Sequence, residues 1–336
     1  MANATAEVGR RDIWNTKLRG LVGTLGMLPV LILVAICFQL LSHGRFFAAQ
    51  NVSIILQQAS VNTVLAAGMT FVILTGGIDL SVGSILAAAA MAGLIISNMA
   101  YLSYLWIFAA LGVGLGFGVI NGLLIAGLRL PPFIVTLGSL TAVRGLARLM
   151  GGDTTIFNSD IPYAFIGNGA IPVIPGIFSI PGLAVIALLV IAISWFVLKR
   201  TVLGTHIYSV GGNEAAARLS GIKVPRIYLI VYGISGLLSG VGAIMLSTRL
   251  YAANGLQLGQ SYELDAIAAV ILGGTSFVGG IGSIWGTLIG ALIIAVLTNG
   301  LILVGVSDIW QYVIKGLVII GAVALDRFRQ KGSART

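Results

Sequence analysis

The sequence predicts an all-α protein, a polytopic bundle of about ten transmembrane helices with both termini in the cytoplasm. Of its 336 residues, 58% are apolar and only 9% are charged, and the mean hydropathy is +1.05. Soluble domains carry charge on about a quarter of their residues, so this chain has too little charge to cover a surface exposed to water. Runs of about 20 apolar residues recur, each long enough to cross a hydrocarbon layer of roughly 30 Å. We therefore expect residues 1–336 to form a single transmembrane domain with lipid as its solvent.

The expected spans follow the apolar runs in order along the chain. The first run follows a basic N-terminal segment and is too long for the apolar core of a signal peptide, so we expect it to stay as an uncleaved span. The ten predicted spans cover about 20–41, 53–75, 83–99, 105–128, 132–150, 182–198, 227–248, 262–280, 284–304 and 309–325.

The basic residues predict the orientation of the bundle. Fourteen of the 19 Lys and Arg residues fall in the terminal tails or in short loops on one side, and the positive-inside rule makes that side cytoplasmic. Loop 199–226 is then cytoplasmic, and loop 151–181 is expected to be an ordered external loop. Arg144, Arg148 and Lys315 lie inside predicted spans, so we expect them to face protein, a cavity or an interface. Nucleic-acid binding is not expected, because no basic segment is both long and soluble.

Other residue patterns argue against enzymatic and metal sites. The single cysteine, Cys37, lies in the first apolar run, so we expect neither an intrachain disulfide nor a metal site built from a cluster of cysteines. No glycine run matches the phosphate-binding pattern G-x-x-x-x-G-K-[ST]. Glycines four residues apart, such as Gly114 and Gly118, are expected to let helices pack closely. The two histidines, His43 and His206, lie in loops without catalytic partners, which argues against an intramembrane enzyme.

Three polar groups that interrupt the apolar runs are candidate pathway sites. The first, near the start of the second span, suits hydrogen bonding to a neutral polyhydroxylated solute, or equally hydrogen bonding between helices. The second is the segment 74–84, where Asp79 is either a functional carboxylate at membrane depth or the N-cap of the next helix. In the third, Glu263 and Asp265 either face a pathway or cap a helix. The candidate pathway residues are Gln57, Gln58, Asn62, Thr75, Asp79, Ser81, Glu263, Asp265, Thr275 and Ser276.

Loop 199–226 contains the segment GGNEAAARLSGI at residues 211–222, which predicts a short amphipathic helix. Asn213 can cap it, Glu214 suits its first turn, the alanines propagate it, and Gly221 can end it in the left-handed conformation. A helix of about two turns is not stable alone in water, so we expect it to dock on a partner.

This segment resembles the Glu-Ala-Ala coupling segment of ABC importer permeases, and the chain from about residue 50 onward resembles the ribose-type sugar permease family. The matching pieces are ILQQASVN at 55–62, GMT at 68–70, LTGGIDLSVGS at 74–84, GGNEAAARLSGI at 211–222 and YELDAIAAVILGGTS at 262–276.

The resemblance implies a homodimeric permease of the bacterial inner membrane that imports a monosaccharide. Ribose is expected ahead of another sugar, a polyol or a furanosyl signalling molecule. The partners it implies are a cytoplasmic ATPase, which would hold ATP and Mg²⁺, and a periplasmic sugar-binding protein, so no cofactor and no enzymatic activity are expected of this chain. The residues that the resemblance assigns to the ATPase contact are Asn213, Glu214, Ala215, Arg218 and Gly221.

A second class of function remains open from the residues alone. An ion-coupled secondary transporter needs intramembrane acids or broken helices that bind a coupling cation. Asp79, Glu263 and Asp265 are the acids that could serve it, although the coupling-type loop would then be unexplained.

Overall fold

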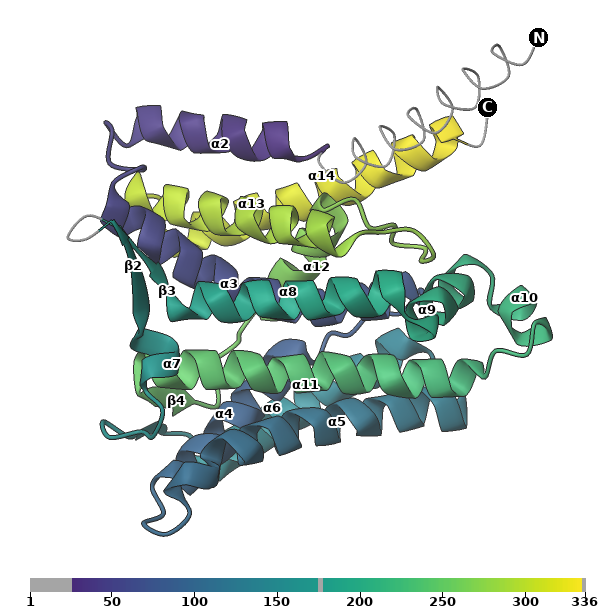
Figure 1. Cartoon of the computed structure of the whole chain (residues 1–336), viewed down its shortest axis with the longest axis horizontal. Coiled ribbons are helices and arrows are strands. Elements are labelled where there is room, and N and C mark those ends of the chain that lie inside the picture. The colour runs from purple at the N-terminus through teal and green to yellow at the C-terminus, as the bar shows by residue number, and fades with distance from the viewer. Residues whose placement is uncertain (1–25, 175–177, 334–336) are drawn as a thin grey trace, which may run out of the picture.

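The computed structural model describes residues 26–174 and 178–333, and most of these residues are helical. The long helices lie side by side, with the strands at one end of the bundle and α9 and α10 at the other (Figure 1). The helices are α2 (Leu28–Leu41), α3 (Ala49–Leu74), α4 (Val82–Ser97), α5 (Trp106–Leu128), α6 (Pro132–Met150), α7 (Phe165–Asn168), α8 (Gly182–Arg200), α9 (Val202–Gly212), α10 (Glu214–Leu219), α11 (Val224–Leu250), α12 (Tyr262–Leu272), α13 (Ile284–Leu303) and α14 (Asp308–Ser333).

Six helices of the described chain are long and apolar enough to cross a membrane. They are α3, α5 with the 3-10 turn that precedes it, α6, α8, α11 and α13, and the shorter helices α2 and α4 are also apolar. The predicted membrane helical bundle is confirmed at this level. The start of the first predicted span, residues 20–25, lies outside the described residues.

The prediction of a helix over 262–280 is wrong. α12 has 11 residues and ends at Leu272, so it is roughly 16 Å long and crosses about half of a hydrocarbon layer. Glycines stop it: Gly274, Gly279 and Gly280 have φ of 84°, 98° and 74°, a region that other residues rarely adopt. Residues 273–283 therefore form an irregular connection to α13.

Two small sheets complete the fold, so the all-α prediction needs this correction. β1 (Thr155–Phe157) pairs antiparallel with β4 (Ala252–Asn254), and β2 (Ala170–Ile174) pairs antiparallel with β3 (Phe178–Pro181). β1, α7, β2 and β3 all lie in the loop that the sequence predicts to be ordered. The strands pair backbone groups that the connections between helices would otherwise leave without partners.

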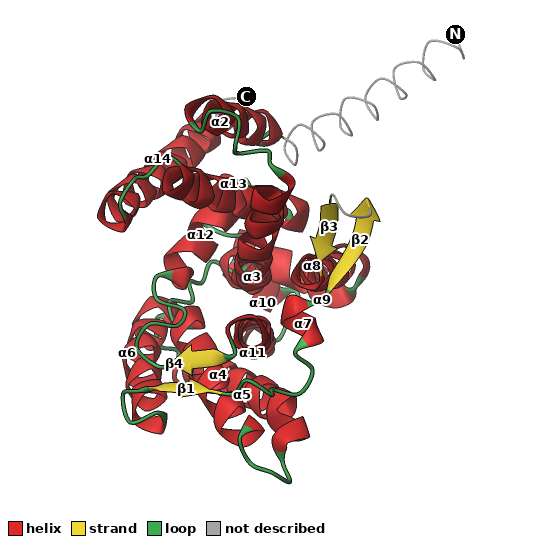
Figure 2. Ribbon diagram, turned by 90° about the vertical axis from the view of Figure 1, so that its left-hand side faces the viewer, coloured by secondary structure: helices red, strands yellow, loops and turns green. Residues whose placement is uncertain are grey.

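The interior of the bundle is built around α3, α11 and α13, which are the most buried of the long apolar helices. Viewed along the helices, α3 and α11 lie near the middle (Figure 2). Gly114 and Gly118 of α5 lie against Gly236 and Gly240 of α11, and a Cβ on Gly118 would be 2.9 Å from the Cα of Gly236. The expected packing role of glycines four residues apart is confirmed here, while Gly112 of the same helix faces open space.

Candidate functional site

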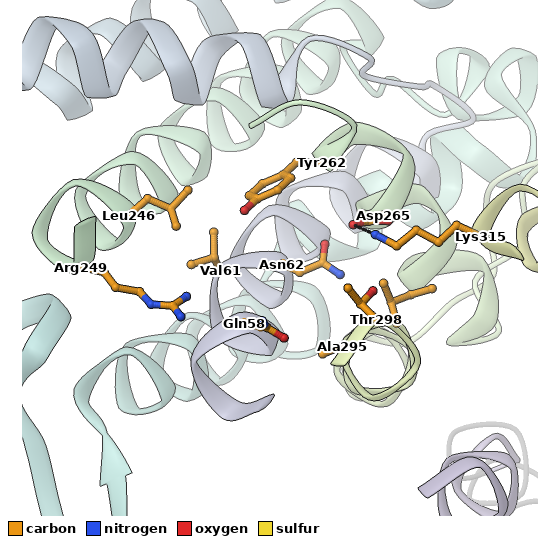
Figure 3. Close-up of a pocket in the computed structure, with 11 residues that line it drawn as sticks. Gln58, Val61, Asn62, Leu246, Arg249, Tyr262, Asp265, Ala295, Thr298 and Lys315 are labelled. Carbon is orange, nitrogen blue, oxygen red and sulfur yellow. Dashed lines mark hydrogen bonds and ion pairs between the residues drawn. The ribbon is translucent and has the colours of Figure 1, made fainter. Parts of the chain in front are cut away.

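A polar pocket of about 180 Å³ lies among α3, α11, α12, α13 and α14 (Figure 3). Gln58 and Asn62 reach it from near the middle of α3, Tyr262 and Asp265 from α12, and Lys315 from α14. Its volume is more than ten times the roughly 10–15 Å³ that one water molecule needs. The pocket can therefore hold a small solute or several waters.

The amides of Gln58 and Asn62 are the unusual feature of this pocket. Oε1 of Gln58 and both side-chain polar atoms of Asn62 are buried and make no hydrogen bond to the described residues. An unpaired buried polar group costs about 1–3 kcal/mol, so these atoms are suited to bonding water or a solute. Residues four apart share one helix face, and Gln57 does not line the pocket.

Asp265 and Lys315 form an ion pair at the edge of the pocket. Nζ of Lys315 is 2.9 Å from Oδ2 of Asp265, and their side chains are 20% and 17% exposed (Figure 3). The pair joins α14 to α12. Asp265 thus lies both in the first turn of α12 and at the pocket, so its position is compatible with each of the two roles that the sequence left open. The expectation that Lys315 faces protein or a cavity is confirmed.

Asp79 lies in a separate buried network outside the pocket. Its Oδ1 accepts hydrogen bonds from the backbone N–H and the hydroxyl of Ser81 at 3.0 and 2.6 Å. Its Oδ2 accepts one from Ser235 of α11 at 2.8 Å. α4 begins after Ser81, and Asp79 accepts the N–H of Ser81 as a capping side chain does, so the buried carboxylate also serves the start of this helix.

The network continues into two more helices. Asn121 of α5 donates to the Ser81 hydroxyl at 2.9 Å and accepts a hydrogen bond from Ser139 of α6. Thr136 of α6 donates to the carbonyl oxygen of Ile78 at 3.1 Å. The irregular segment between α3 and α4 is therefore held by α5, α6 and α11, which makes it a rigid brace.

Three other predicted pathway residues lie in connections near the α9 end of the bundle and do not line the pocket. Thr75, just after α3, donates to the carbonyl oxygen of Val72 at 2.8 Å. Thr275 is buried with its hydroxyl unpaired among the described residues, and the N–H of Ser276 donates to Ile281 at 2.8 Å. These connections meet where the N–H of Gly280 donates to Leu74 at 3.0 Å.

The three acids that could bind a coupling cation do not form one cluster. Asp79 lies among serines, Asp265 pairs with Lys315, and Glu263 lies beside Gly83 at the start of α4. The described residues contain no group of three His, Cys, Asp or Glu side chains that could hold a metal ion.

Arg144 and Arg148 also have partners, as expected of cations in predicted spans. Arg144 donates to the carbonyl oxygens of Gly255, Leu258 and Gly259 at 3.1, 2.6 and 3.3 Å. Arg148 forms a bidentate pair with Asp153 at 2.7 and 2.8 Å, and the hydrogen bonds from Arg148 lower the pKa of Asp153. The sequence predicts that both arginines face protein, a cavity or an interface, but it does not predict which groups they contact.

The short helix predicted in loop 199–226 is confirmed as α10, which has six residues. The Asn213 side chain caps it by accepting from the N–H of Ala216 at 2.9 Å, and Gly221 after it has a φ of +86°. Ala215 is exposed. α10 rests on the bundle through Ala217, while Leu219 is 90% exposed.

The side chains of α10 connect it to the start of α11. Oε1 of Glu214 forms an ion pair with Nη2 of Arg218 at 2.7 Å. Oε2 of Glu214 accepts a hydrogen bond from the hydroxyl of Tyr228 of α11 at 3.2 Å. Together with Arg129 and Pro131 of the α5–α6 turn, these side chains line a groove of about 270 Å³. The exposed short helix is the one that the sequence predicts for this loop, and its docking on a partner stays a prediction.

A helical membrane bundle with a polar pocket among its helices and an exposed short helix at one end fits a membrane transport subunit. The comparison with protein families identifies which one. Residues 51–323 match the family described as "branched-chain amino acid transport system / permease component", and the chain belongs to this family.

Individual relatives agree with this family over nearly the whole chain. The ribose import permease RbsC of Bacillus subtilis is 44% identical over 90% of this chain and 91% of its own length. RbsC of Escherichia coli K12 is 42% identical over 90% and 93%, and the fructose import permease FrcC of Rhizobium meliloti is 38% identical over 91% and 86%. No solved structure matches.

The resemblance to ribose-type permeases is thereby confirmed. The chain is a multi-pass membrane permease of a bacterial binding-protein-dependent ABC importer and not an enzyme. Such a permease works with an ATPase and a binding protein, and the permease component carries no cofactor of its own.

Proposed function

We propose that this permease imports ribose. The relatives named for ribose import are more similar to it than those named for import of fructose or of galactose and methyl galactoside, which are 38% and 35% identical. The observation that carries the proposal is the unpaired pair of amides, Gln58 and Asn62, at the pocket. An amide offers both a donor and an acceptor, which suits a neutral solute rich in hydroxyl groups.

The candidate pathway residues then divide by position. Gln58, Asn62 and Asp265 contact the solute or its waters, and Glu263 lies on the route beside them. Asp79 and Ser81 brace the break between α3 and α4. Thr75, Thr275 and Ser276 shape the connections at the α9 end, and Gln57 is assigned to helix packing.

The distribution of the basic residues between the two sides of the membrane sets the orientation of the assembly. Two copies of the chain form the membrane unit, each with about ten crossings, one of which is made by α12 together with the irregular residues 255–261 that precede it. The termini and the α9–α10 end lie in the cytoplasm, where Asn213, Glu214, Ala215, Arg218 and Gly221 present α10 to the ATPase. The strand end faces the periplasm and receives the sugar-binding protein.

Uptake of radiolabelled ribose into proteoliposomes tests this function. The vesicles contain the permease with its ATPase and binding protein, and unlabelled fructose, xylose and galactose serve as competitors. We expect uptake that requires ATP, that unlabelled ribose inhibits more strongly than the other three sugars do, and that Glu214→Ala reduces while Ser220→Ala at the C-cap of α10 does not. Uptake by the permease alone, driven by an ion gradient and indifferent to Glu214, would overturn the proposal in favour of a secondary transporter. Stronger competition by another sugar would change the assigned solute.

A further inference from the structure

The hairpin formed by β2 and β3 exposes an apolar surface at the strand end of the bundle. All five residues of β2 are exposed, and Ile171, Val173 and Ile174 are 54%, 52% and 48% exposed. No residue from 161 to 198 carries a charge, and this stretch includes the hairpin and nearly all of α8. A contiguous apolar patch on a protein surface usually marks contact with another protein or with a membrane. The surface of β2 therefore needs a partner other than water.

The fold places this surface next to α8. β3 is the inner strand and packs against α3 and α8, while the N–H of Gly182, the first residue of α8, donates to Gly169 at 2.7 Å. The strands run across the end of the bundle rather than along the helices (Figure 1), on the α8 side and away from α6 (Figure 2). α8 is long and apolar enough to cross a membrane. Its exposed positions include Leu188, Leu189, Ile193 and Phe196. The exposed face of β2 thus continues a surface that suits lipid.

The backbone of β2 decides between the interior and the surface of the lipid layer. In the described part of the chain β2 pairs only with β3, so N–H and C=O groups on its other edge have no strand partner. Such groups are costly in hydrocarbon, where no water can satisfy them. At the membrane–water interface, water and headgroups satisfy the free edge while apolar side chains enter the acyl region.

A proline on this edge argues against a protein strand as the partner. Pro172 lies in the middle of β2 and has no N–H to donate. Proline on an edge strand disfavours pairing with a strand of another chain. The free edge of β2 therefore suits a lipid surface better than the addition of another strand.

Aromatic rings beside the hairpin are typical of the same environment. The ring of Tyr163 lies 6.1 Å from that of Tyr104 and 6.5 Å from that of Phe165, and all three side chains are exposed. Phe165 is the first residue of α7, which leads directly into β2. Tyrosine is enriched at membrane–water interfaces, where its ring meets lipid and its hydroxyl meets water. The rings extend the apolar surface of the hairpin around the strand end.

We propose that the β2–β3 hairpin lies flat in the membrane–water interface of the outer leaflet, with Ile171, Val173 and Ile174 at the boundary between headgroups and acyl chains. The inference rests on the proposed function for the choice of leaflet, because that function puts the strand end on the periplasmic side. It also divides the strand end between two partners. The β1–β4 sheet, which lies nearer to α6 (Figure 2), receives the binding protein, and the hairpin holds the end of α8 at the membrane surface.

Quenching by spin-labelled lipids measures where the hairpin lies. Cys37 is the only cysteine, so Cys37→Ser gives a background for Ile171→Cys and Val173→Cys. Ser159→Cys, at an exposed position earlier in the same loop, is the control for water, and Leu189→Cys of α8 is the control for the lipid interior. Each cysteine is labelled with the small fluorophore bimane. The permease is reconstituted with its ATPase in phosphatidylcholine vesicles that carry a nitroxide either on the headgroup or deep in the acyl chain.

The interface position predicts a distinct pattern of quenching. We expect the headgroup nitroxide to quench bimane at Ile171→Cys and Val173→Cys at least about threefold more strongly than at Ser159→Cys. The deep nitroxide should quench both hairpin labels less than the label at Leu189→Cys. Addition of the sugar-binding protein with ribose should leave the hairpin labels unchanged, because they face lipid.

The other outcomes overturn the inference, each in its own way. Headgroup quenching as weak as at Ser159→Cys would put the hairpin in water, and deep quenching as strong as at Leu189→Cys would put it in hydrocarbon. A change in hairpin fluorescence on addition of the binding protein would assign this surface to that protein. ATP-driven ribose uptake by the unlabelled wild-type chain is measured in vesicles of the same lipid. Loss of that uptake would remove the proposed function but not the quenching result, which needs no transport.

Discussion

Two polar groups lie inside this bundle, and they differ in how their hydrogen bonds are satisfied. Around Asp79, both carboxylate oxygens accept hydrogen bonds from serines, and the network reaches α5, α6 and α11. Around Gln58 and Asn62, amide atoms stay unpaired beside a cavity of about 180 Å³. A satisfied network rigidifies the backbone that it holds, whereas unpaired groups next to space are free to bind. The first group should therefore govern stability and the second transport.

The largest effect is expected at Asp79. Asp79→Leu removes the acceptor of three hydrogen bonds and strands the hydroxyl of Ser235, which should lower the free energy of unfolding by about 3–5 kcal/mol. Asp79→Asn keeps an acceptor and should lose less. Thermal unfolding of the purified permease in detergent measures both. Wild-type stability in Asp79→Leu would show that the network is no brace.

A smaller loss is expected at the ion pair between α12 and α14. Lys315→Met leaves the largely buried carboxylate of Asp265 without its cation, at a cost of roughly 2 kcal/mol, between the values for exposed and buried pairs. The double variant Lys315→Met with Asp265→Leu removes the stranded charge and should regain part of that stability. The same unfolding assay tests this, and additive losses in the double variant would contradict the pairing.

Substitutions at the pocket should change the rate of transport rather than the stability of the fold. Asn62→Ala removes an amide that bonds solute only, so ribose uptake should fall about tenfold, the equivalent of one hydrogen bond of about 1.4 kcal/mol, with unfolding unchanged. Gln57→Ala, on the same helix but away from the pocket, is the matched control. Equal losses in both variants would argue that the amides pack helices.

The smallest effect is expected at α10, where a satisfied polar group is exposed. Asn213→Ala removes the cap of this six-residue helix and should cost about 1 kcal/mol. Asn213→Ser keeps a capping oxygen and serves as the control. Hydrogen exchange of the α10 amides should become about fivefold faster in Asn213→Ala only, and unchanged exchange would mean that packing of Ala217 alone holds the helix.

The sequence predicts most of the bundle because lipid permits so few alternatives. Long apolar runs must become helices in a bilayer, and the cap of α10 is local, so Asn213 could be assigned from its neighbours. The end of α12 depends on the positive φ of Gly274, Gly279 and Gly280, which hydropathy does not report.

The candidate site was less predictable, because tertiary packing decides which side chains meet. Both Gln57 and Gln58 interrupt the same apolar run, and only the spacing of four between Gln58 and Asn62 separates them in the sequence. Ser81, which makes two of the three hydrogen bonds to Asp79, is a neighbour in the sequence. Ser235, which makes the third, and residues 255–259, which contact Arg144, are distant along the chain, and only the folded bundle brings them close.

The glycine contact between α5 and α11 bears on how force from ATP hydrolysis would enter the membrane. α10 leads within a few residues into α11, and Tyr228 ties the two together. Gly118 and Gly236 bring the backbones of α5 and α11 into direct contact. Few side chains lie between the two helices there, so a displacement of one helix cannot be absorbed by rearranging side chains. A displacement of α10 would thus move α11 and α5 together as one rigid pair, and α11 would not bend alone.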